Sequence, residues 1–135
     1  DTIVLLQPTS PFRTSQHIKE AIALYREDLD MVVSVTQPAS NPFYVAMQED
    51  DQGYLRKALD GKYTRRQDCP TVYEYNGAVY VININSLISK GMQGFDKNIK
   101  YEMDAISSHD LDNMQDWMYC EFLIERGLVK LNKCK

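Results

Sequence analysis

The stretch DTIVLLQPTSPFRTSQHIKEAIALYREDLDMVVSV, residues 1–35, decides the predicted fold. Residues 2–6 and 31–35 are short runs rich in Ile, Val and Leu, which is typical of buried strands. Between them we expect a helix whose N-cap is Thr14 or Ser15. Its apolar side chains recur three and four residues apart, at Ile18, Ala21, Ile22 and Tyr25. Strand, helix and strand in this order indicate a βαβ unit with a parallel sheet and a right-handed crossover.

The rest of the chain predicts further strands and helices with no repeat or linker. Two short strands are expected around a turn at residues 50–53, and a final helix after Asp112 is expected to end at Gly127. The other expected elements are a strand at 72–83 interrupted by Asn76-Gly77, a helical turn at 86–89, a strand at 99–103 and a closing strand at 128–131. The 135 residues are therefore expected to form a single α/β domain, 1–135.

Composition excludes several classes of protein. The net charge of −4 argues against nucleic-acid binding. No apolar run approaches the roughly 20 residues that span a bilayer, so we expect no membrane partner. The three cysteines have no CxxC spacing, which fits a cytoplasmic protein without disulfides or zinc. Five basic residues gather between positions 56 and 66 and indicate either a solvated loop or an anion site: Arg56, Lys57, Lys62, Arg65 and Arg66.

Two motifs place polar side chains at predicted strands. Gln7 and Ser10 follow the first strand in a proline-rich loop, where ligands of α/β sheets collect; a stiff connection without a ligand explains the loop equally well. Gly77 interrupts a strand beside Asn76, whose amide suits sugar hydroxyls. A glycine there indicates close approach of a ligand or of another backbone, or a simple bulge.

Two carboxylates precede the last helix. Asp110 and Asp112 are two residues apart, so in an extended segment both side chains point the same way. Hard oxygen ligands of this kind suit Mg²⁺, which takes one or two carboxylates and completes its shell with water and phosphates. Alternatively, Asp112 caps the helix and Gln115 completes a capping box.

Three motifs, in order, resemble the acylneuraminate cytidylyltransferases, the CMP-sialic acid synthetases. They are LLQPTSPFR (residues 5–13), RRQDCP with YNGAVYV (65–70 and 75–81) and DLDNMQDW (110–117). The resemblance implies a Rossmann-like nucleotidyltransferase fold with a mixed, mostly parallel sheet. It also implies a homodimer, with sugar binding and dimerisation around residues 41–103. Because the chain has no glycine-rich phosphate loop and begins at Asp1, we expect that it is the C-terminal portion and that the N-terminal part is missing.

The resemblance also implies roles for individual residues. Gln7, Asn76 and Tyr80 match residues that contact the sugar, and Arg66 matches an arginine near the sugar and phosphate. Asp110 and Asp112 match the carboxylates that hold Mg²⁺, so the catalytic set is Arg66, Asp110 and Asp112. The substrate-binding set is Gln7, Ser10, Arg66, Asn76 and Tyr80. Neither His17 nor His109 stands out as a general base.

The implied reaction joins CTP and a nine-carbon acidic sugar to give the CMP-sugar and pyrophosphate. Tyr44 stands where sialic acid enzymes often have lysine, which favours a legionaminic-type sugar. We expect this chain alone to be inactive, because most phosphate contacts would be absent. Two alternatives remain: a metal-dependent glycosyltransferase that uses Asp110-Leu111-Asp112 as its DxD motif, and a non-catalytic module for sugar binding or dimerisation.

Overall fold

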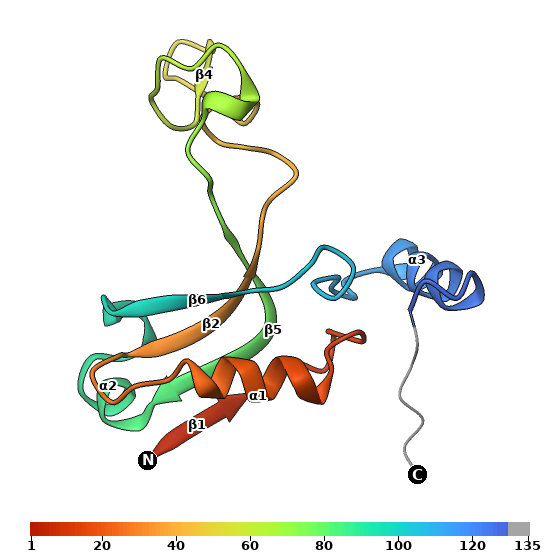
Figure 1. Cartoon of the computed structure of the whole chain (residues 1–135). Coiled ribbons are helices and arrows are strands. Elements are labelled where there is room, and N and C mark those ends of the chain that lie inside the picture. The colour runs from red at the N-terminus through yellow and green to blue at the C-terminus, as the bar shows by residue number, and fades with distance from the viewer. Residues whose placement is uncertain (130–135) are drawn as a thin grey trace. The chain divides into compact units, whose positions relative to one another are not determined.

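The structure, a computed structural model, describes residues 1–129 (Figure 1). It divides the chain into two compact units. Unit 1 comprises Asp1–Thr36 and Tyr75–Lys135, and unit 2 comprises Gln37–Glu74. Residues 41–103, the predicted sugar-binding and dimerisation segment, therefore divide between the two units. Among the described residues no helix is long and apolar enough to cross a membrane.

Unit 1 contains a four-stranded mixed sheet. Its strands, in spatial order, are β1 (Thr2–Leu5), β5 (Glu74–Asn83), β2 (Met31–Thr36) and β6 (Asn98–Glu102). β1 is antiparallel to β5, whereas β2 is parallel to β6. The β5–β2 pair is antiparallel: Asn83 N–H donates to the carbonyl of Asp30, and Val79 N–H donates to Ser34 Oγ. Higher residue numbers in β5 therefore lie beside lower residue numbers in β2.

The predicted mixed α/β fold is confirmed, but two details of the sheet differ from expectation. β5 lies between β1 and β2, so the strands of the expected βαβ unit are not neighbours, and only the β2–β6 pair is parallel among residues 1–129. β1 was expected to be buried, and all four of its residues are exposed. β1 is exposed because it lies at the edge of the sheet, whereas the longer apolar strand β5 lies inside it.

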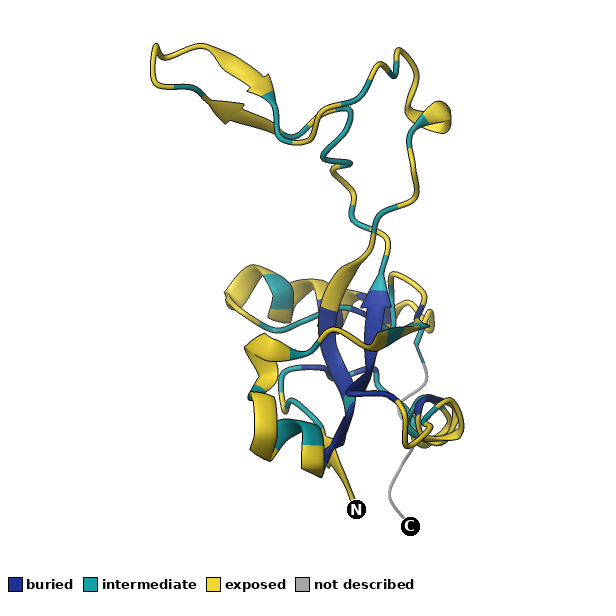
Figure 2. Cartoon of the chain, turned by 90° about the vertical axis from the view of Figure 1, so that its left-hand side faces the viewer, coloured by how far each residue is buried: buried dark blue, intermediate teal, exposed yellow. Residues whose placement is uncertain are grey.

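The core of unit 1 lies on β2 and β5, whose buried residues form the dark centre of Figure 2. Alternate side chains of β2 enter two clusters on opposite faces of the sheet. Val32 packs with Ala21 of α1 (Ser15–Ala23), and Val33 packs with Ile82 and the half-buried Leu87 of α2 (Ile84–Lys90). Both faces of the two inner strands are thus covered.

Side-chain caps fix where the helices begin. Thr14 caps α1, and its hydroxyl accepts the N–H of His17, so one of the two predicted caps is confirmed. The last helix, α3 (Met114–Glu125), is capped by Asn113 in a capping box with Asp116. The alternative reading of Asp112 and Gln115 as the cap is therefore wrong. Asn113 takes this role because its Oδ1 accepts the N–H groups of Gln115 and Asp116.

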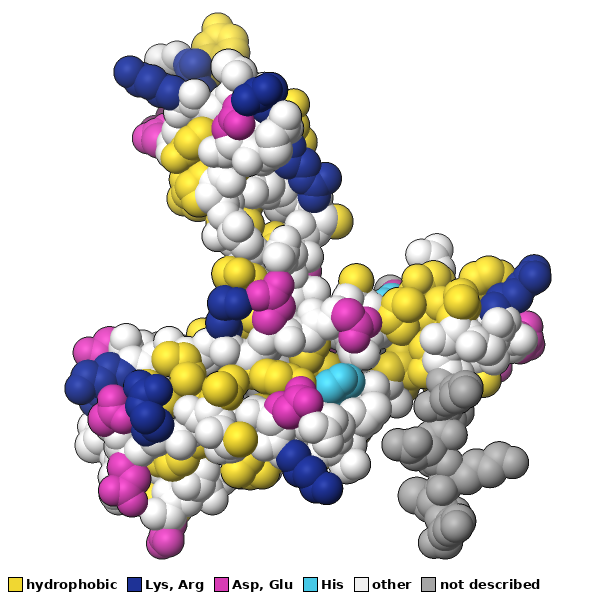
Figure 3. All heavy atoms as spheres, in the orientation of Figure 1, with side chains coloured by type: hydrophobic (Ala, Val, Ile, Leu, Met, Phe, Trp, Pro, Cys, Tyr) yellow, Lys and Arg dark blue, Asp and Glu magenta, His cyan; other side chains and the backbone are white. Residues whose placement is uncertain are grey.

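Helix α3 leaves much of its apolar surface exposed. Cys120 and Leu123 are buried with Phe12, whereas Trp117, Phe122 and Ile124 of the same helix are exposed. Figure 3 shows the resulting group of hydrophobic side chains over α3. Gly127 follows the helix with φ +67°, as its predicted place at the helix end requires.

Unit 2 contains an antiparallel hairpin of β3 (Met47–Glu49) and β4 (Leu55–Lys57), which confirms the predicted pair of short strands. Asp50 Oδ1 accepts the backbone N–H groups of Gln52 and Tyr54 and so shapes the turn. Residues 1–129 also include two short 3₁₀ helices, η1 (Arg66–Asp68) in unit 2 and η2 (Met92–Gly94) in unit 1. The predicted closing strand at 128–131 reaches beyond the described residues, and 128–129 are not extended.

Candidate functional site

The loop after β1 lies against the glycine of β5. A Cβ atom added to Gly77, whose φ is +74°, would overlap Gln7 Oε1 and lie 3.0 Å from Gln7 Cδ. Residue 77 is therefore glycine for two reasons: the backbone is in the left-handed region, and the Gln7 carboxamide occupies the space beside it. The sequence predicted a ligand, another backbone or a bulge at Gly77, and the group that approaches it in this structure is instead a side chain.

Arg13 joins the same two segments through their backbones. Its Nη1 donates to the carbonyl of Gln7 at 2.7 Å and to the carbonyl of Ala78 at 2.9 Å. Burial lowers the pKa of the Arg13 guanidinium, which still remains charged because arginine titrates far above neutral pH. Charge-assisted bonds to two carbonyls hold the loop on β5.

Asn76 lies in a buried network of side chains. Its Oδ1 accepts from Ser34 Oγ at 2.5 Å and from the Ala78 N–H at 3.1 Å. Its Nδ2 donates to Ser108 Oγ at 2.9 Å. Ser34 and Ser108 are both buried, so the amide is held at both ends before any ligand binds.

Ser10 is buried in the loop, with 4% of its surface exposed. Among the described residues its hydroxyl has no hydrogen-bond partner. Buried hydroxyls ordinarily have partners, so this group is available to a ligand or a water. That availability is compatible with the predicted substrate-binding role of Ser10, which stays a prediction.

The two predicted metal carboxylates lie next to this loop. The N–H of Leu111 donates to the carbonyl of Thr9 at 2.9 Å, so the segment that carries Asp110 and Asp112 adjoins the Gln7–Ser10 loop. Asp110 is half-buried, and its Oδ1 accepts the N–H of Leu111 at 3.1 Å, whereas Asp112 is exposed. The described residues contain no group of three or more potential metal ligands. Two carboxylates nevertheless fit the donor set of a Mg²⁺ that takes its other ligands from water and phosphate.

Tyr80 is a half-buried residue of β5. Burial raises the pKa of its hydroxyl, and the charges of Tyr75 and Asp110 add smaller increases. The hydroxyl therefore stays protonated at neutral pH and can donate a hydrogen bond. In this state Tyr80 can orient a polar ligand but cannot serve as a base.

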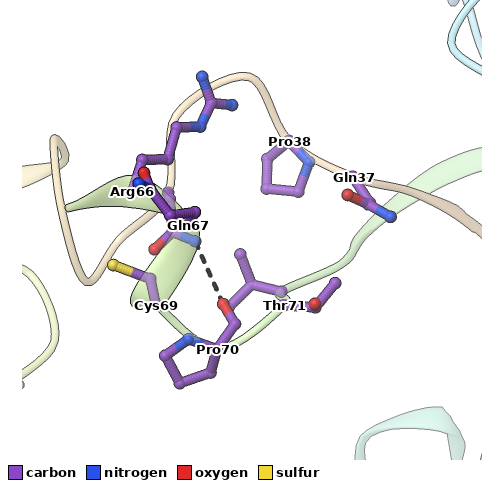
Figure 4. Close-up of a pocket in the computed structure, with 9 residues that line it drawn as sticks. Gln37, Pro38, Arg66, Gln67, Cys69, Pro70 and Thr71 are labelled. Carbon is purple, nitrogen blue, oxygen red and sulfur yellow. Dashed lines mark hydrogen bonds between the residues drawn. The ribbon is translucent and has the colours of Figure 1, made fainter. Parts of the chain in front are cut away.

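Arg66 belongs to unit 2 and lines a pocket of about 380 Å³ within that unit (Figure 4). Its Nη2 donates to the carbonyl of Ala39 at 3.1 Å. Asn41 and Pro70 also line this pocket, and Asn41 Nδ2 donates to the carbonyl of Pro70. The pocket is lined by Gln37, Pro38, Asn41, Arg66, Gln67, Cys69, Pro70, Thr71 and Val72. Of the predicted site residues, Arg66 alone belongs to unit 2.

Other basic side chains near Arg66 have local partners. Arg65 forms a two-point ion pair with Asp68, at 2.8 and 3.0 Å. Arg56 pairs with Asp50 at 2.9 Å, and Lys57 donates to the carbonyl of Tyr63. Each of these three basic residues therefore bonds to another group within unit 2.

Three contributors to the site were not predicted from the sequence: Arg13, Ser34 and Ser108. Arg13 ends the LLQPTSPFR motif, but its partner Ala78 lies 65 residues away. Ser34 stands in an apolar strand, and a hydroxyl inside such a run was the one available hint. The ring of His109, which lies beside Asp110, meets the Tyr119 ring at 59° with 4.9 Å between centroids, and its Nε2 lies 3.8 Å from Asp116 Oδ1.

The chain resembles curated proteins over most of its length, although no family model matches it. An N-acylneuraminate cytidylyltransferase of Streptococcus agalactiae is 32% identical over 117 residues, covering 86% of this chain and 28% of that protein. One of Escherichia coli is 34% identical over 120 residues, covering 87% and 28%. A CMP-N,N'-diacetyllegionaminic acid synthase of Legionella pneumophila is 26% identical over 126 residues, covering 93% and 54%.

These relatives define a class, that of cytidylyltransferases and of synthases of CMP-linked acids. The chain is similar to the acylneuraminate cytidylyltransferases among these relatives, and the resemblance predicted from its motifs is confirmed. The chain spans between 28% and 54% of the length of the three relatives.

Proposed function

We propose that this chain is part of a cytidylyltransferase that activates a nine-carbon acidic sugar, either sialic acid or a legionaminic-type sugar. The observation that carries the proposal is the meeting of three separate motifs in unit 1. The Gln7 carboxamide lies on Gly77, Arg13 donates to the carbonyls of Gln7 and Ala78, and the Thr9 carbonyl accepts the N–H of Leu111. The names of the relatives support sugar activation by cytidylyl transfer.

In the proposed reaction, the anomeric hydroxyl of the sugar attacks the α-phosphorus of CTP and pyrophosphate leaves. Gln7, Ser10, Asn76 and Tyr80 orient the sugar by hydrogen bonds, and Arg66 supplies a fixed positive charge. Asp110 and Asp112 would hold Mg²⁺, which when bound offsets the charge of the phosphates. Catalysis of this kind depends on positioning and charge neutralisation.

The proposal includes the setting of the enzyme. We infer a Rossmann-like nucleotidyltransferase fold, which the mixed α/β sheet is compatible with, and a homodimer. Cys69 and Cys120 are free thiols, as a reducing cytoplasm would maintain. The 135-residue chain alone is expected to be inactive, because no glycine-rich loop for a triphosphate occurs in its sequence.

The test is pyrophosphate release with CTP, Mg²⁺ and a panel of acidic sugars, in this chain and in a longer protein that contains it. We expect turnover in the longer protein, dependent on CTP and on Mg²⁺, and a loss of at least about 100-fold in Asp112→Asn, as removal of one electrostatic contact commonly gives. The best sugar decides between sialic and legionaminic acids.

Two outcomes would redirect the proposal. Transfer of a sugar from a nucleotide-sugar to an acceptor, without pyrophosphate, would favour the metal-dependent glycosyltransferase. Sugar binding without turnover by either reaction would favour the non-catalytic module.

A further inference from the structure

The orientation of the Asn76 amide is fixed by donors that cannot reverse their role. The backbone N–H of Ala78 can only donate, so the side-chain atom that it meets at 3.1 Å is the acceptor Oδ1. Ser34 Oγ accepts the Val79 N–H at 2.7 Å and directs its own proton to the same Oδ1. The amide oxygen therefore points into the protein and has two donors.

The other end of the amide points to Ser108. Nδ2 donates to Ser108 Oγ at 2.9 Å, and the Ser108 hydroxyl donates in turn to the carbonyl of Met103 at 3.4 Å. A primary amide has two N–H groups, and Ser108 is the acceptor that the structure gives to Nδ2 within residues 1–129. One N–H of Asn76 thus remains for a ligand, whereas its oxygen is already engaged by two donors.

We propose that Asn76 meets the sugar as a hydrogen-bond donor only, to an acceptor oxygen of the sugar, and that Ser34 and Ser108 are positioning residues that fix this polarity. This inference rests on the proposed function. Ser34 is fully buried and Ser108 is 8% exposed, so both act through Asn76. The polarity follows from a chain of bonds that runs from β2 through Asn76 to the loop after β6.

The polarity is tested by comparing Asn76→Asp with Asn76→Ala in the longer protein. Aspartate keeps an oxygen for Ala78 and Ser34 but replaces the amide nitrogen, with both of its N–H groups, by a second oxygen. We expect Asn76→Ala to raise the KM for the sugar about tenfold, the worth of one hydrogen bond of about 1.4 kcal/mol, and Asn76→Asp to raise it at least as much. An Asn76→Asp enzyme that binds the sugar better than Asn76→Ala would overturn the donor role.

The positioning role is tested with Ser108→Ala, and Ser89→Ala of α2 is the matched control because Ser89 is exposed and bonds only within its helix. We expect Ser108→Ala to raise the KM for the sugar roughly three- to tenfold while the KM for CTP and kcat stay unchanged. An equal change in both KM values would indicate a purely structural role and would refute positioning.

A measurement without any sugar separates this inference from the proposed function. In ¹⁵N NMR spectra of the 135-residue chain, we expect the Asn76 side-chain proton that is donated to Ser108 to exchange slowly with solvent, and Ser34→Ala to accelerate the exchange of this proton at least about tenfold. Fast exchange in the unsubstituted chain would sink the fixed orientation. Slow exchange in a protein that activates no sugar would refute the sugar as ligand and leave the orientation standing.

Discussion

The carboxamide of Gln7 fills the space that a Cβ atom on residue 77 would need. This contact joins the end of β1 to the middle of β5, and it relates two positions 70 apart in the sequence. The glycine provides both a left-handed backbone and the room for the carboxamide, so a larger residue at position 77 would displace Gln7.

Replacing Gly77 by alanine should therefore cost more than backbone strain alone. A left-handed conformation costs about 1–2 kcal/mol in a residue other than glycine, and the displaced Gln7 side chain adds to this. Gly53→Ala is the matched control, because Gly53 has φ +83° and nothing within 4 Å of the added atom. Urea unfolding should give the larger loss for Gly77→Ala, and equal losses would contradict the importance of the contact.

Replacing Arg13 by methionine, which retains much of the volume, should lower the free energy of unfolding by about 1–3 kcal/mol, since two carbonyls lose a charged donor. The control is Arg26→Met. Arg26 and Asp28 form an exposed ion pair in which both side chains are more than 60% exposed. Such pairs contribute about 0–1 kcal/mol. If Arg13→Met unfolds at the same urea concentration as the control, Arg13 does not hold the loop.

The capping box of α3 gives different structural roles to two nearby aspartates, Asp112 and Asp116. Asp116 Oδ2 accepts the N–H groups of Asp112 and Asn113 at 3.0 and 2.9 Å. Asp116→Ala should therefore cost about 1 kcal/mol in thermal unfolding, and Asp112→Ala less than about 0.5 kcal/mol, as for an exposed surface residue. A larger loss of stability in Asp112→Ala would show that Asp112 supports the helix and would weaken its assignment to a metal.

Asp30 should make the stability of unit 1 depend on pH. Hydrogen bonds from Ser86, from the backbone N–H groups of Lys97 and Asp96 and from Lys90 lower the pKa of this carboxyl. Its Oδ1 and Oδ2 lie 3.0 and 3.1 Å from Lys90 Nζ. Because the folded pKa is below the unfolded value of about 3.9, the stabilisation is complete above that pH and is lost as the pH falls through the folded pKa.

The check is urea unfolding of Asp30→Asn and the unsubstituted chain between pH 7 and pH 2. We expect the variant to be the less stable protein at pH 7 and the difference to shrink below about pH 4, where the unfolded carboxyl protonates. Asp51→Asn, in the exposed hairpin turn, serves as the control and should show no such trend. A difference that is constant with pH would mean that the Asp30 charge does not contribute.

The sequence predicted features that depend on neighbouring residues. The cap at Thr14 and the hairpin around Asp50 follow from local hydrogen bonding. The order of the strands was not predictable in the same way. A run of Ile, Val and Leu indicates burial but does not say whether a strand lies inside a sheet or, as β1 does, at its edge.

In the candidate site, too, some features could be predicted from the local sequence and others could not. The motif around Gln7 indicated a ligand because its polar groups follow a strand, where ligands of α/β sheets collect. The motif around Asn76 did so because Gly77 interrupts a strand. The partners of Asn76 were hidden, since Ser34 and Ser108 are 42 and 32 residues away from it. Contacts over such separations leave no periodicity in the sequence, so only folding brings them together.

Unit 2 is inserted between two strands that are already hydrogen-bonded neighbours, β2 ending at Thr36 and β5 beginning at Glu74. Antiparallel neighbours need only a two-residue turn to be joined. The sheet thus has no topological need for residues 37–74, and their length and sequence can change in evolution without altering the strand register. The contacts that hold Gln7, Gly77 and Asn76 all lie in unit 1, so they need no residue of the insertion.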